Sequence, residues 1–404
     1  MFELLVVLLA FAAYSLFSKR LGRTVLTLPI LFTGLGLVLS APLQVAVPSG
    51  VAEEGKVILA EVTLILVLFA GASHVRFGRL RMNWALPARM LVVGMPLTIA
   101  LGTAVAFGLN PGTSLAMALL TAAVLTPTDA ALGQAVVTNP EVPEHLGQTI
   151  NVESGLNDGL ALPFVLLGAT LASTMLTQEP LSGPHLVVEA LAEVTFGLLA
   201  GVATGWATAK AMDWAQTRDL MQIPAGAVVF VLSAFAAHVA AILLGGNGFI
   251  AAFVAGMTFG NTYRHDIHFI SEFMEGAGQL LTMTAFLVFG AFLLPEGIAH
   301  AGMSTAILAV LFLTVVRILP IVISLAGTGL PMREKLFLGW FGPRGLASIL
   351  FTLLMMAAFE FPNEPELLAC VSLTVGLSIV LHGITANPFA RRVGQTRKPI
   401  RKGH

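Results

Sequence analysis

The sequence predicts an all-α polytopic membrane protein with thirteen transmembrane helices. Of its 404 residues, 56% are hydrophobic and 11% are charged, whereas a typical soluble protein carries about 25% charged residues. Apolar stretches of roughly 20 residues, the length that a membrane-spanning helix needs, recur along the whole chain. No segment alternates apolar and polar residues as the strands of a membrane β-barrel do.

Composition also excludes several partners and cofactors. The net charge of −1 leaves no positive field for phosphates, so nucleic acid is not an expected partner. The single cysteine, Cys370, excludes a disulfide within the chain and a cysteine-based metal site. Because no group of histidines and cysteines has the spacing of metal ligands, we expect no cofactor.

Charged residues, prolines and glycines divide the chain into thirteen predicted spans. They lie near 2–17, 25–40, 57–73, 86–107, 113–138, 149–173, 186–210, 221–244, 247–261, 272–294, 302–326, 334–358 and 366–388. The first span follows no basic segment and precedes Lys19, Arg20 and Arg23, which is the wrong order for a signal peptide. We therefore interpret it as a retained helix.

The basic residues predict which loops face the cytoplasm. With the N-terminus outside, 18 of the 21 lysines and arginines fall in cytoplasmic loops or in the tail at 389–404, and only Lys56 falls in an external loop. This bias follows the positive-inside rule and requires an odd number of spans. We expect a multi-pass protein of the cell (inner) membrane, with a short basic cytoplasmic tail and no soluble regulatory domain.

Charged residues inside the predicted spans are the candidates for function, because each costs about 2.5–3.5 kcal/mol at the centre of a membrane helix. Asp129, Glu153 and Asp158 lie in the fifth and sixth spans. Arg317 and Arg344 lie in the eleventh and twelfth. Arg317 could pair with an acid of the interior or extend its long side chain toward the headgroups.

The sixth span carries Glu153, Ser154, Asn157 and Asp158 at helical spacing. Ser154 and Asp158 are four residues apart and share one face, and Glu153 and Asn157 share another. A carboxylate beside a hydroxyl is a hard-oxygen site, which suits Na⁺, Li⁺ or H⁺ and not a soft metal.

Two of the spans contain a proline break. Pro127 interrupts the fifth span, and Pro343, flanked by Gly342 and Gly345, interrupts the twelfth. Such a break is tolerated in lipid only where it lines a cavity or is buried by protein. The breaks lie seven spans apart, which predicts two inverted six-helix repeats whose broken helices cross at the membrane midplane.

Four stretches of the chain form a recognisable set: TPTDAALGQAVV at 126–137, NVESGLNDGLALP at 151–163, NGFIAAFVAGMTFGN at 247–261 and LFLGWFGPRGLAS at 336–348. Together they resemble the NhaP/NHE-type Na⁺/H⁺ antiporters of the monovalent cation:proton antiporter-1 family. The resemblance covers nearly the whole chain. It implies a homodimer with an elevator mechanism, in which a core part (86–173 and 302–388) moves against a dimerisation part (1–73 and 186–294).

The resemblance also implies roles for individual residues. Asp158 carries the exchanged ion, Ser154 and Thr128 are neighbouring ligands, Asn157 holds the crossed helices together, and Glu153 pairs with Arg344. Several family members have a further glutamate in the third span, where this chain has Ala70, so the resemblance does not distinguish Na⁺, Li⁺ and K⁺. Glu61 lies on the same span, near its outer end.

Counting charges predicts the stoichiometry. If Glu153 and Arg344 pair and cancel, and if Asp129 is offset by the helix N-termini and by Arg317, Asp158 is left as the group whose charge can change. A bare carboxylate is costly to move through a desolvated site, whereas a carboxylate that holds one Na⁺ or one H⁺ is neutral. We expect electroneutral one-for-one exchange by competition at Asp158, with Asp129 as a secondary ligand.

Other functions stay open from the residues alone. They are a K⁺/H⁺ exchanger, a Na⁺-coupled solute symporter on a related scaffold, and an ion channel. A channel would need a continuous polar pore, and buried charges confined to two broken helices argue against one. An intramembrane aspartyl protease would need two equivalent acids, and Arg344 beside Asp129 and Asp158 disfavours such a dyad. We expect a transporter and not an enzyme.

Overall fold

Helices make up all the regular structure of the residues that the computed structural model describes, namely 2–21, 24, 26–75, 84–110, 112–137, 139–177 and 183–394. In chain order they are α1 (Phe2–Leu21), α2 (Leu28–Val38), α3 (Ser40–Ala46), α4 (Ser49–Ser73), α6 (Ala85–Arg89), the π-helical turn η1 (Met90–Gly94), α7 (Met95–Leu109), α8 (Leu115–Val124), α9 (Ala130–Val137), α10 (Glu144–Thr177) and α11 (Gly183–Thr217). They continue with α12 (Ile223–Leu243), α13 (Gly248–Thr262), α14 (His268–Val288), the π-helical turn η2 (Phe289–Leu293), α15 (Leu294–Ala299), α16 (Met303–Leu313), α17 (Val315–Ser324), α18 (Met332–Trp340), α19 (Leu346–Ala358) and α20 (Glu364–Gly394).

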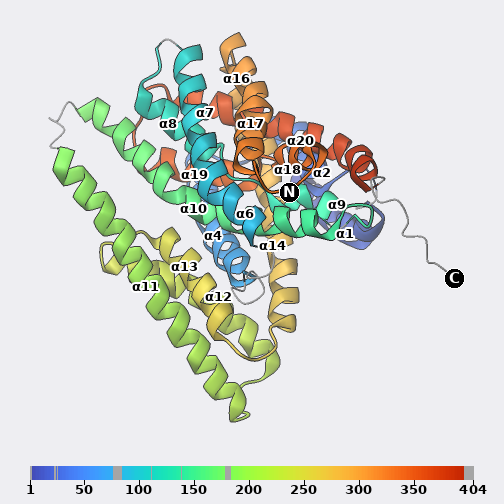
Figure 1. The fold of residues 1–404 in the computed structure, drawn as a ribbon, viewed down its shortest axis with the longest axis vertical. Helices are drawn as coiled ribbons and strands as arrows, with labels where there is room; N and C mark the ends of the chain where they lie inside the picture. Colours follow the sequence, from blue (N-terminus) through green and yellow to red (C-terminus); the bar gives the residue numbers. More distant parts are fainter. Residues whose placement is uncertain are drawn as a thin grey trace.

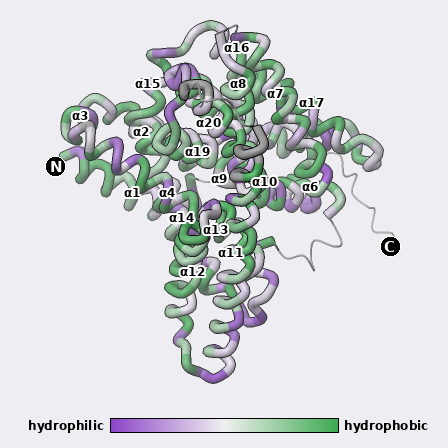
Figure 2. The backbone as a smooth tube through the Cα atoms, turned by 90° about the vertical axis from the view of Figure 1, so that its left-hand side faces the viewer, coloured by the Kyte–Doolittle hydropathy of each residue, from purple (hydrophilic) through white to green (hydrophobic). Residues whose placement is uncertain are grey.

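Most of these helices can cross a membrane. Nine spans in the described part of the chain are long and apolar enough to do so, and the pair α2–α3, bent by 62°, would be a tenth. The helices α8, α13 and α19 are apolar but shorter. Apolar residues cover the helices, and hydrophilic residues gather at turns such as the one between α11 and α12 (Figure 2). The chain is therefore a multi-pass membrane protein.

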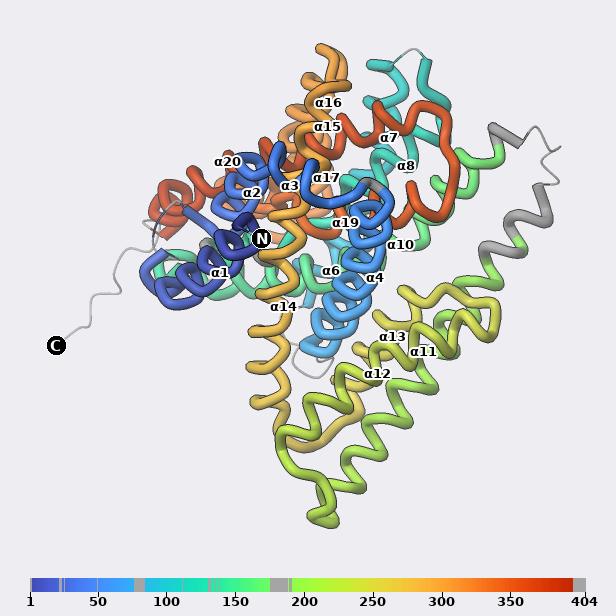
Figure 3. The backbone as a smooth tube through the Cα atoms, turned by 180° about the vertical axis from the view of Figure 1, so that it is seen from behind, coloured from blue at the N-terminus to red at the C-terminus, as the bar shows by residue number. Residues whose placement is uncertain are grey.

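Two hydrophobic cores meet at α4 and α14. One core joins α4 and α14 to α11, α12 and α13, which lie together at one end of the molecule (Figure 1). The other joins α4 and α14 to α8, α10, α16, α19 and α20. Seen from behind, α14 extends from the middle of the molecule toward the end where α11, α12 and α13 lie (Figure 3).

Glycines allow α4 and α13 to touch backbone to backbone. A Cβ atom at Gly256 would lie 2.1 Å from the carbonyl oxygen of Phe69, and one at Gly260 would lie 2.0 Å from that of Ser73. No larger residue fits at either position without moving a helix. Small residues spaced four apart serve close helix packing in membranes, where lipid provides no hydrophobic drive for association.

The last helix is longer than the sequence predicts. The predicted span ends at 388, before a tail at 389–404, but α20 continues to Gly394 with Pro388 inside it. The helix continues because Ala390 and Val393 are buried against Phe337 of α18 in a third, smaller core. Residues 395–404 of the predicted tail lie outside the described residues, as do Arg23 and the loop arginines at 76–81.

Candidate ion-binding site

The two interrupted helices meet at their breaks. α8 ends at Val124 before α9 begins, α18 ends at Trp340 before α19 begins, and the segments at 125–129 and 341–345 between them are not helical. The backbone N–H of Asp129 donates to the carbonyl oxygen of Pro343 at 2.8 Å. The breaks predicted at the two prolines are thus present, and they contact each other.

Asp129 caps two helices at this crossing. Its carboxylate accepts hydrogen bonds from the backbone N–H groups of Leu132 in α9, at 3.3 Å, and Leu346 in α19, at 2.6 Å. The N-terminus of a helix carries a partial positive charge that stabilises a carboxylate. Gly345 makes the contact possible, because a Cβ atom there would lie 2.1 Å from the Asp129 Oδ2 atom.

Arg344 has the opposite arrangement. Its guanidinium is fully buried and donates to the carbonyl oxygens of Thr126 and Pro127, which follow the end of α8. These carbonyls lie just beyond the C-terminus of that helix, where its negative partial charge also favours a cation, so the positive charge of the arginine is compensated there. The crossing therefore holds one acid on helix N-termini and one base on a helix C-terminus.

Glu153 pairs with Arg317, and the expected pairing with Arg344 is wrong. The Arg317 guanidinium donates to both Glu153 carboxylate oxygens, at 2.6 and 2.7 Å, and both side chains are buried. Gly342 provides the room, since a Cβ atom there would lie 2.2 Å from Arg317 Nε. Because Arg344 is held by the carbonyls of Thr126 and Pro127, Arg317 takes the carboxylate and does not extend toward the headgroups.

The polar side chains of α10 reach the first break. Asn157 Nδ2 donates to Thr128 Oγ1, and the Thr128 and Ser154 hydroxyls are 3.1 Å apart. All three residues are buried. The contact between Asn157 and Thr128 links α10 to the segment between α8 and α9, so the structure brings together three of the predicted site residues.

Two buried oxygens beside this network accept no hydrogen bond from the described residues. They are Oδ1 of Asp158 and Oδ1 of Asn157, on consecutive residues of α10. Asp158 lies one turn beyond Ser154 on the same face. A carboxylate oxygen, an amide oxygen and hydroxyls form a hard-oxygen donor set that suits a monovalent cation. Among the described residues, no group of three histidine, cysteine, aspartate or glutamate side chains could hold a metal.

α4 brings no carboxylate to this place. Beside Ala70, where the resemblance implied a glutamate in several family members, Gly71 lies against Gly155 of α10. Glu61 is farther along α4 and lies 3.2 Å from His238 Nε2 of α12. The Glu61 carboxylate, whose side chain is 45% exposed, is thus paired with a buried histidine.

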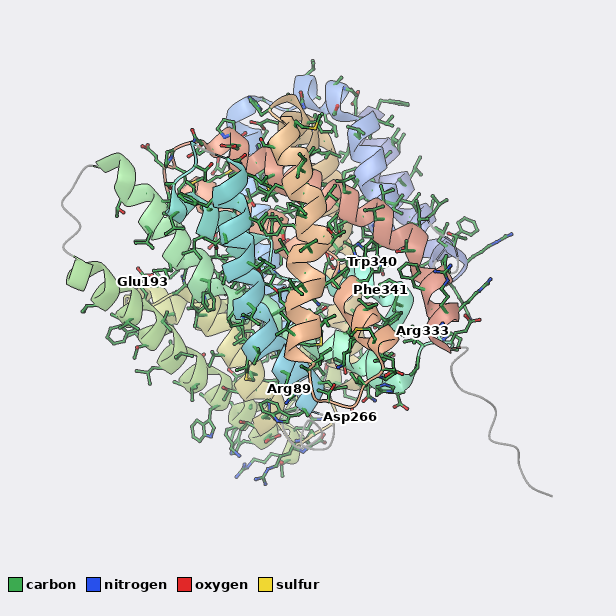
Figure 4. The ribbon with its side chains drawn as sticks, turned by 45° about the horizontal axis from the view of Figure 1, so that its top comes forward. Arg89, Glu193, Asp266, Arg333, Trp340 and Phe341 are labelled. Carbon is green, nitrogen blue, oxygen red and sulfur yellow. The ribbon has the colours of Figure 1, made fainter. Side chains whose placement is uncertain are left out.

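The sequence analysis missed His382 of α20, which binds the second break. Its Nε2 atom is 2.9 Å from the carbonyl oxygen of Trp340, the last residue of α18, and its Nδ1 atom is 3.2 Å from Ser378 Oγ. The Ser378 hydroxyl accepts the backbone N–H of Arg344 at 2.8 Å. The Nδ1 atom is also 2.9 Å from the carbonyl oxygen of Ser378, so each ring nitrogen faces a backbone carbonyl and the neutral ring donates to one of the two. The spacing of Ser378 and His382, four residues apart, was the available signal. Figure 4 shows where Trp340 and Phe341 lie at the end of α18.

A sequence model of the family described as "Sodium/hydrogen exchanger, transmembrane" matches residues 6–392. The chain belongs to this family. The resemblance to the NhaP/NHE-type antiporters is thereby confirmed, and the homologues of this chain are antiporters and not enzymes.

Similar proteins include antiporters named for two different cations. The exchanger is 24% identical over 337 residues to the K(+)/H(+) antiporter NhaP of Alkalimonas amylolytica, covering 83% of this chain and 57% of that protein. It is 25% identical over 363 residues to the Na(+)/H(+) antiporter 2 of Zygosaccharomyces rouxii, covering 80% and 44%. The chain thus spans about half the length of these curated relatives.

A solved structure has the same fold. The sodium proton antiporter MjNhaP1 from Methanocaldococcus jannaschii, at pH 8, superimposes with a TM-score of 0.74 and 19% sequence identity. The match covers 95% of this chain and 99% of that one. The exchanger therefore shares the all-helical architecture of that protein.

Proposed function

We propose that this exchanger is a secondary antiporter that exchanges a monovalent cation for H⁺ at Asp158. One observation carries the proposal: the buried charges are compensated unequally. Glu153 is paired with Arg317, and Asp129 and Arg344 are held by helix ends. The buried Oδ1 atom of Asp158 has no donor among the described residues.

The state of Asp158 then controls transport. A dehydrated cation at Asp158 is surrounded by oxygens of Asn157, Ser154 and Thr128, and a proton at the same carboxylate neutralises it equally. One cation and one proton therefore compete for one negative charge. The compensated charges around them stay fixed, so exchange is electroneutral and one for one. The empty site moves poorly, because an uncompensated charge in a desolvated site is costly.

The arrangement of helices supports the rest of the proposal. If α13 and the interrupted pairs α8–α9 and α18–α19 are counted with the ten longer spans, the total is thirteen. The interrupted helices lie in the proposed core part, at 86–173 and 302–388. The core that joins α11, α12 and α13 lies in the proposed dimerisation part, at 1–73 and 186–294. We propose an elevator movement of the first part against the second in a homodimer of the cell membrane.

Replacing Asp158 by Asn tests the site. In proteoliposomes with an imposed pH gradient, D158N is expected to lose cation-driven dissipation of that gradient, because an amide cannot alternate between a cation-bound and a proton-bound neutral state. The elution volume and melting temperature of the variant are expected to stay close to those of the wild type. Glu296→Gln, which changes a carboxylate in the first turn of α15 outside the crossing, is the matched control. Retained exchange in D158N would show that another residue carries the ion.

The same assay with Na⁺, Li⁺ and K⁺ tests the cation and the stoichiometry. K⁺/H⁺ exchange is the second candidate, because α4 has no carboxylate at the crossing and several relatives are named as K⁺/H⁺ antiporters. We expect the initial rate to be unchanged when a membrane potential is imposed with an ionophore for an ion that is not transported. A rate that follows the potential would contradict one-for-one exchange.

A further inference from the structure

A cavity of about 410 Å³ lies between α18, the helix that precedes the second break, and the C-terminal end of α20. Its lining comes from α18 and α20 and comprises Arg333, Leu336, Phe337, Phe389, Arg392 and Val393. Arg333 lies at the end of α18 opposite Trp340 (Figure 4). The cavity is distant in sequence from Asp158 and takes no part in the proposed exchange.

The two ends of the lining differ in chemistry. Arg333 and Arg392 are both exposed and carry the positive charge, whereas Phe337 and Val393 are buried and form an apolar floor. The Arg392 guanidinium lies over the Phe389 ring at 5.9 Å, which orients it along the cavity. A ligand that fills this space needs an anionic group between the arginines and an apolar portion beneath it.

No aspartate or glutamate in the described part of the chain forms an ion pair with Arg333 or Arg392. The carboxylates on neighbouring turns are paired elsewhere: Glu334 lies 3.2 Å from His145, and Glu141 lies 3.8 Å from Arg391. No acidic residue lines the cavity among the described residues. The guanidinium groups of Arg333 and Arg392 are therefore available to an external anion, and a guanidinium binds phosphate oxygens in a planar, bidentate manner.

The position of the cavity favours a lipid as the source of that anion. Arg333 is in the first turn of α18 and Arg392 is in the last turn of α20, so both lie at ends of helices that the positive-inside rule assigns to the cytoplasmic side. The sequence continues from α20 with Arg397, Lys398, Arg401 and Lys402. A cluster of basic residues directly after a membrane helix is typical of proteins that bind anionic headgroups.

We propose that this cavity binds one anionic phospholipid of the cytoplasmic leaflet. Its phosphate lies between Arg333 and Arg392, and the first part of an acyl chain covers Leu336, Phe337 and Phe389. The lipid links α18 to α20 at their cytoplasmic ends, where the hydrogen bond from Trp340 to Thr385 already links them closer to the break. The inference uses the predicted orientation but not the proposed exchange at Asp158.

Thermal unfolding of the purified full chain in detergent tests the proposal. Dioleoyl-phosphatidylglycerol, dioleoyl-phosphatidylcholine and inorganic phosphate are titrated separately. Phosphatidylglycerol is expected to raise the melting temperature of the wild type in a saturable manner, because a ligand of the folded state stabilises it by mass action. Phosphatidylcholine and inorganic phosphate are expected to give little or no rise.

The double variant R333Q/R392Q is the main comparison. Its apparent affinity for phosphatidylglycerol is expected to fall about fivefold for each arginine removed, while its melting temperature without lipid stays close to that of the wild type. Arg218→Gln is the matched control, since Arg218 also lies over an aromatic ring, that of Trp214 at 4.8 Å, but does not line the cavity. R333K/R392K, which keeps both charges, is expected to retain part of the affinity.

Several results would overturn the proposal. An equal rise with phosphatidylcholine would show binding without headgroup recognition, and an equal rise with inorganic phosphate would show a simple anion site. An unchanged affinity in R333Q/R392Q, or an equal loss in R218Q, would place the lipid elsewhere. Native mass spectrometry, which counts bound phosphatidylglycerol directly, checks the result if R333Q/R392Q has a lower melting temperature before lipid is added.

Discussion

At the scale of single residues, the two buried arginines have different kinds of partner. Arg317 binds a carboxylate with two hydrogen bonds, whereas Arg344 binds backbone carbonyls at the end of a helix. A carbonyl group remains in place whatever the protonation state of the acids. The hydrogen-bond partners of Arg344 therefore do not change when Asp158 gains or loses a proton, which keeps this part of the site fixed during the proposed exchange.

The pair of Glu153 and Arg317 predicts a pattern of stabilities. E153A and R317A are each expected to lower the free energy of unfolding by about 3–5 kcal/mol, because each leaves one buried charge without its partner. The double variant E153A/R317A is expected to be more stable than either single variant, since neither charge remains. Denaturant unfolding in detergent, followed by tryptophan fluorescence, measures all three.

The exposed pair of His268 and Glu272 is the control for this experiment. Their side chains are 73% and 65% exposed, so E272A is expected to change the free energy of unfolding by less than about 1 kcal/mol. A double variant E153A/R317A no more stable than the two single variants would mean that the pair is not the main partner of either charge.

At the scale of elements, glycines permit the crossing of the interrupted helices. Gly345 has a φ angle of −163°, an extended conformation that any residue adopts, so its importance comes from space and not from backbone freedom. A methyl group there would overlap the Asp129 carboxylate, which caps α9 and α19. One added carbon would separate both helix ends from their shared acid.

Gly345→Ala therefore has a defined expected effect. We expect it to lower the free energy of unfolding by about 1–3 kcal/mol, as overpacking does in a filled core, and to reduce exchange in proteoliposomes strongly. Gly108→Ala in α7 is the matched control, because a Cβ atom at that glycine has no neighbour within 4 Å. Equal behaviour of the two variants would show that the contact with Asp129 is unimportant.

The sequence predicts the breaks but not all their partners. Pro127 and Pro343 identify the interruptions because a proline acts on its own helix. The partner of Glu153 depends on which arginine the tertiary structure brings within 3 Å of its carboxylate. Neither the spacing of the residues nor the composition determines that distance. His382 was missed for the same reason, since it binds a carbonyl group 42 residues away in the chain.

At the scale of the whole molecule, the helical architecture and the membrane class follow from composition and are confirmed by the fold of MjNhaP1. The orientation of the chain remains a prediction from the basic residues. The division into a core part and a dimerisation part also remains one, although the separate core around α11, α12 and α13 supports it.

Single cysteines test the orientation. Cys370 is buried, so Cys370→Ala provides a cysteine-free chain into which one exposed position at a time is introduced. In intact cells, a membrane-impermeant maleimide is expected to label Glu360→Cys, in the loop before α20, and not Gln222→Cys, before α12. Labelling of Gln222→Cys is expected after permeabilisation. The reverse pattern would invert the proposed topology.

The two sides of α4 have unequal contacts. On the side of α13, Gly256 and Gly260 are packed against carbonyl groups of α4, and a methyl group added to either glycine would lie about 2 Å from a carbonyl oxygen. On the side of α10, a methyl group added to Gly71 or Gly155 would lie 3.6 Å from the carbonyl oxygen of the other glycine, which is an ordinary van der Waals contact. During the proposed elevator cycle, α4 and α13 would stay fixed relative to each other. The looser contact between Gly71 and Gly155, next to Ser154, would allow α10, which carries Asp158, to move past α4 without a steric clash.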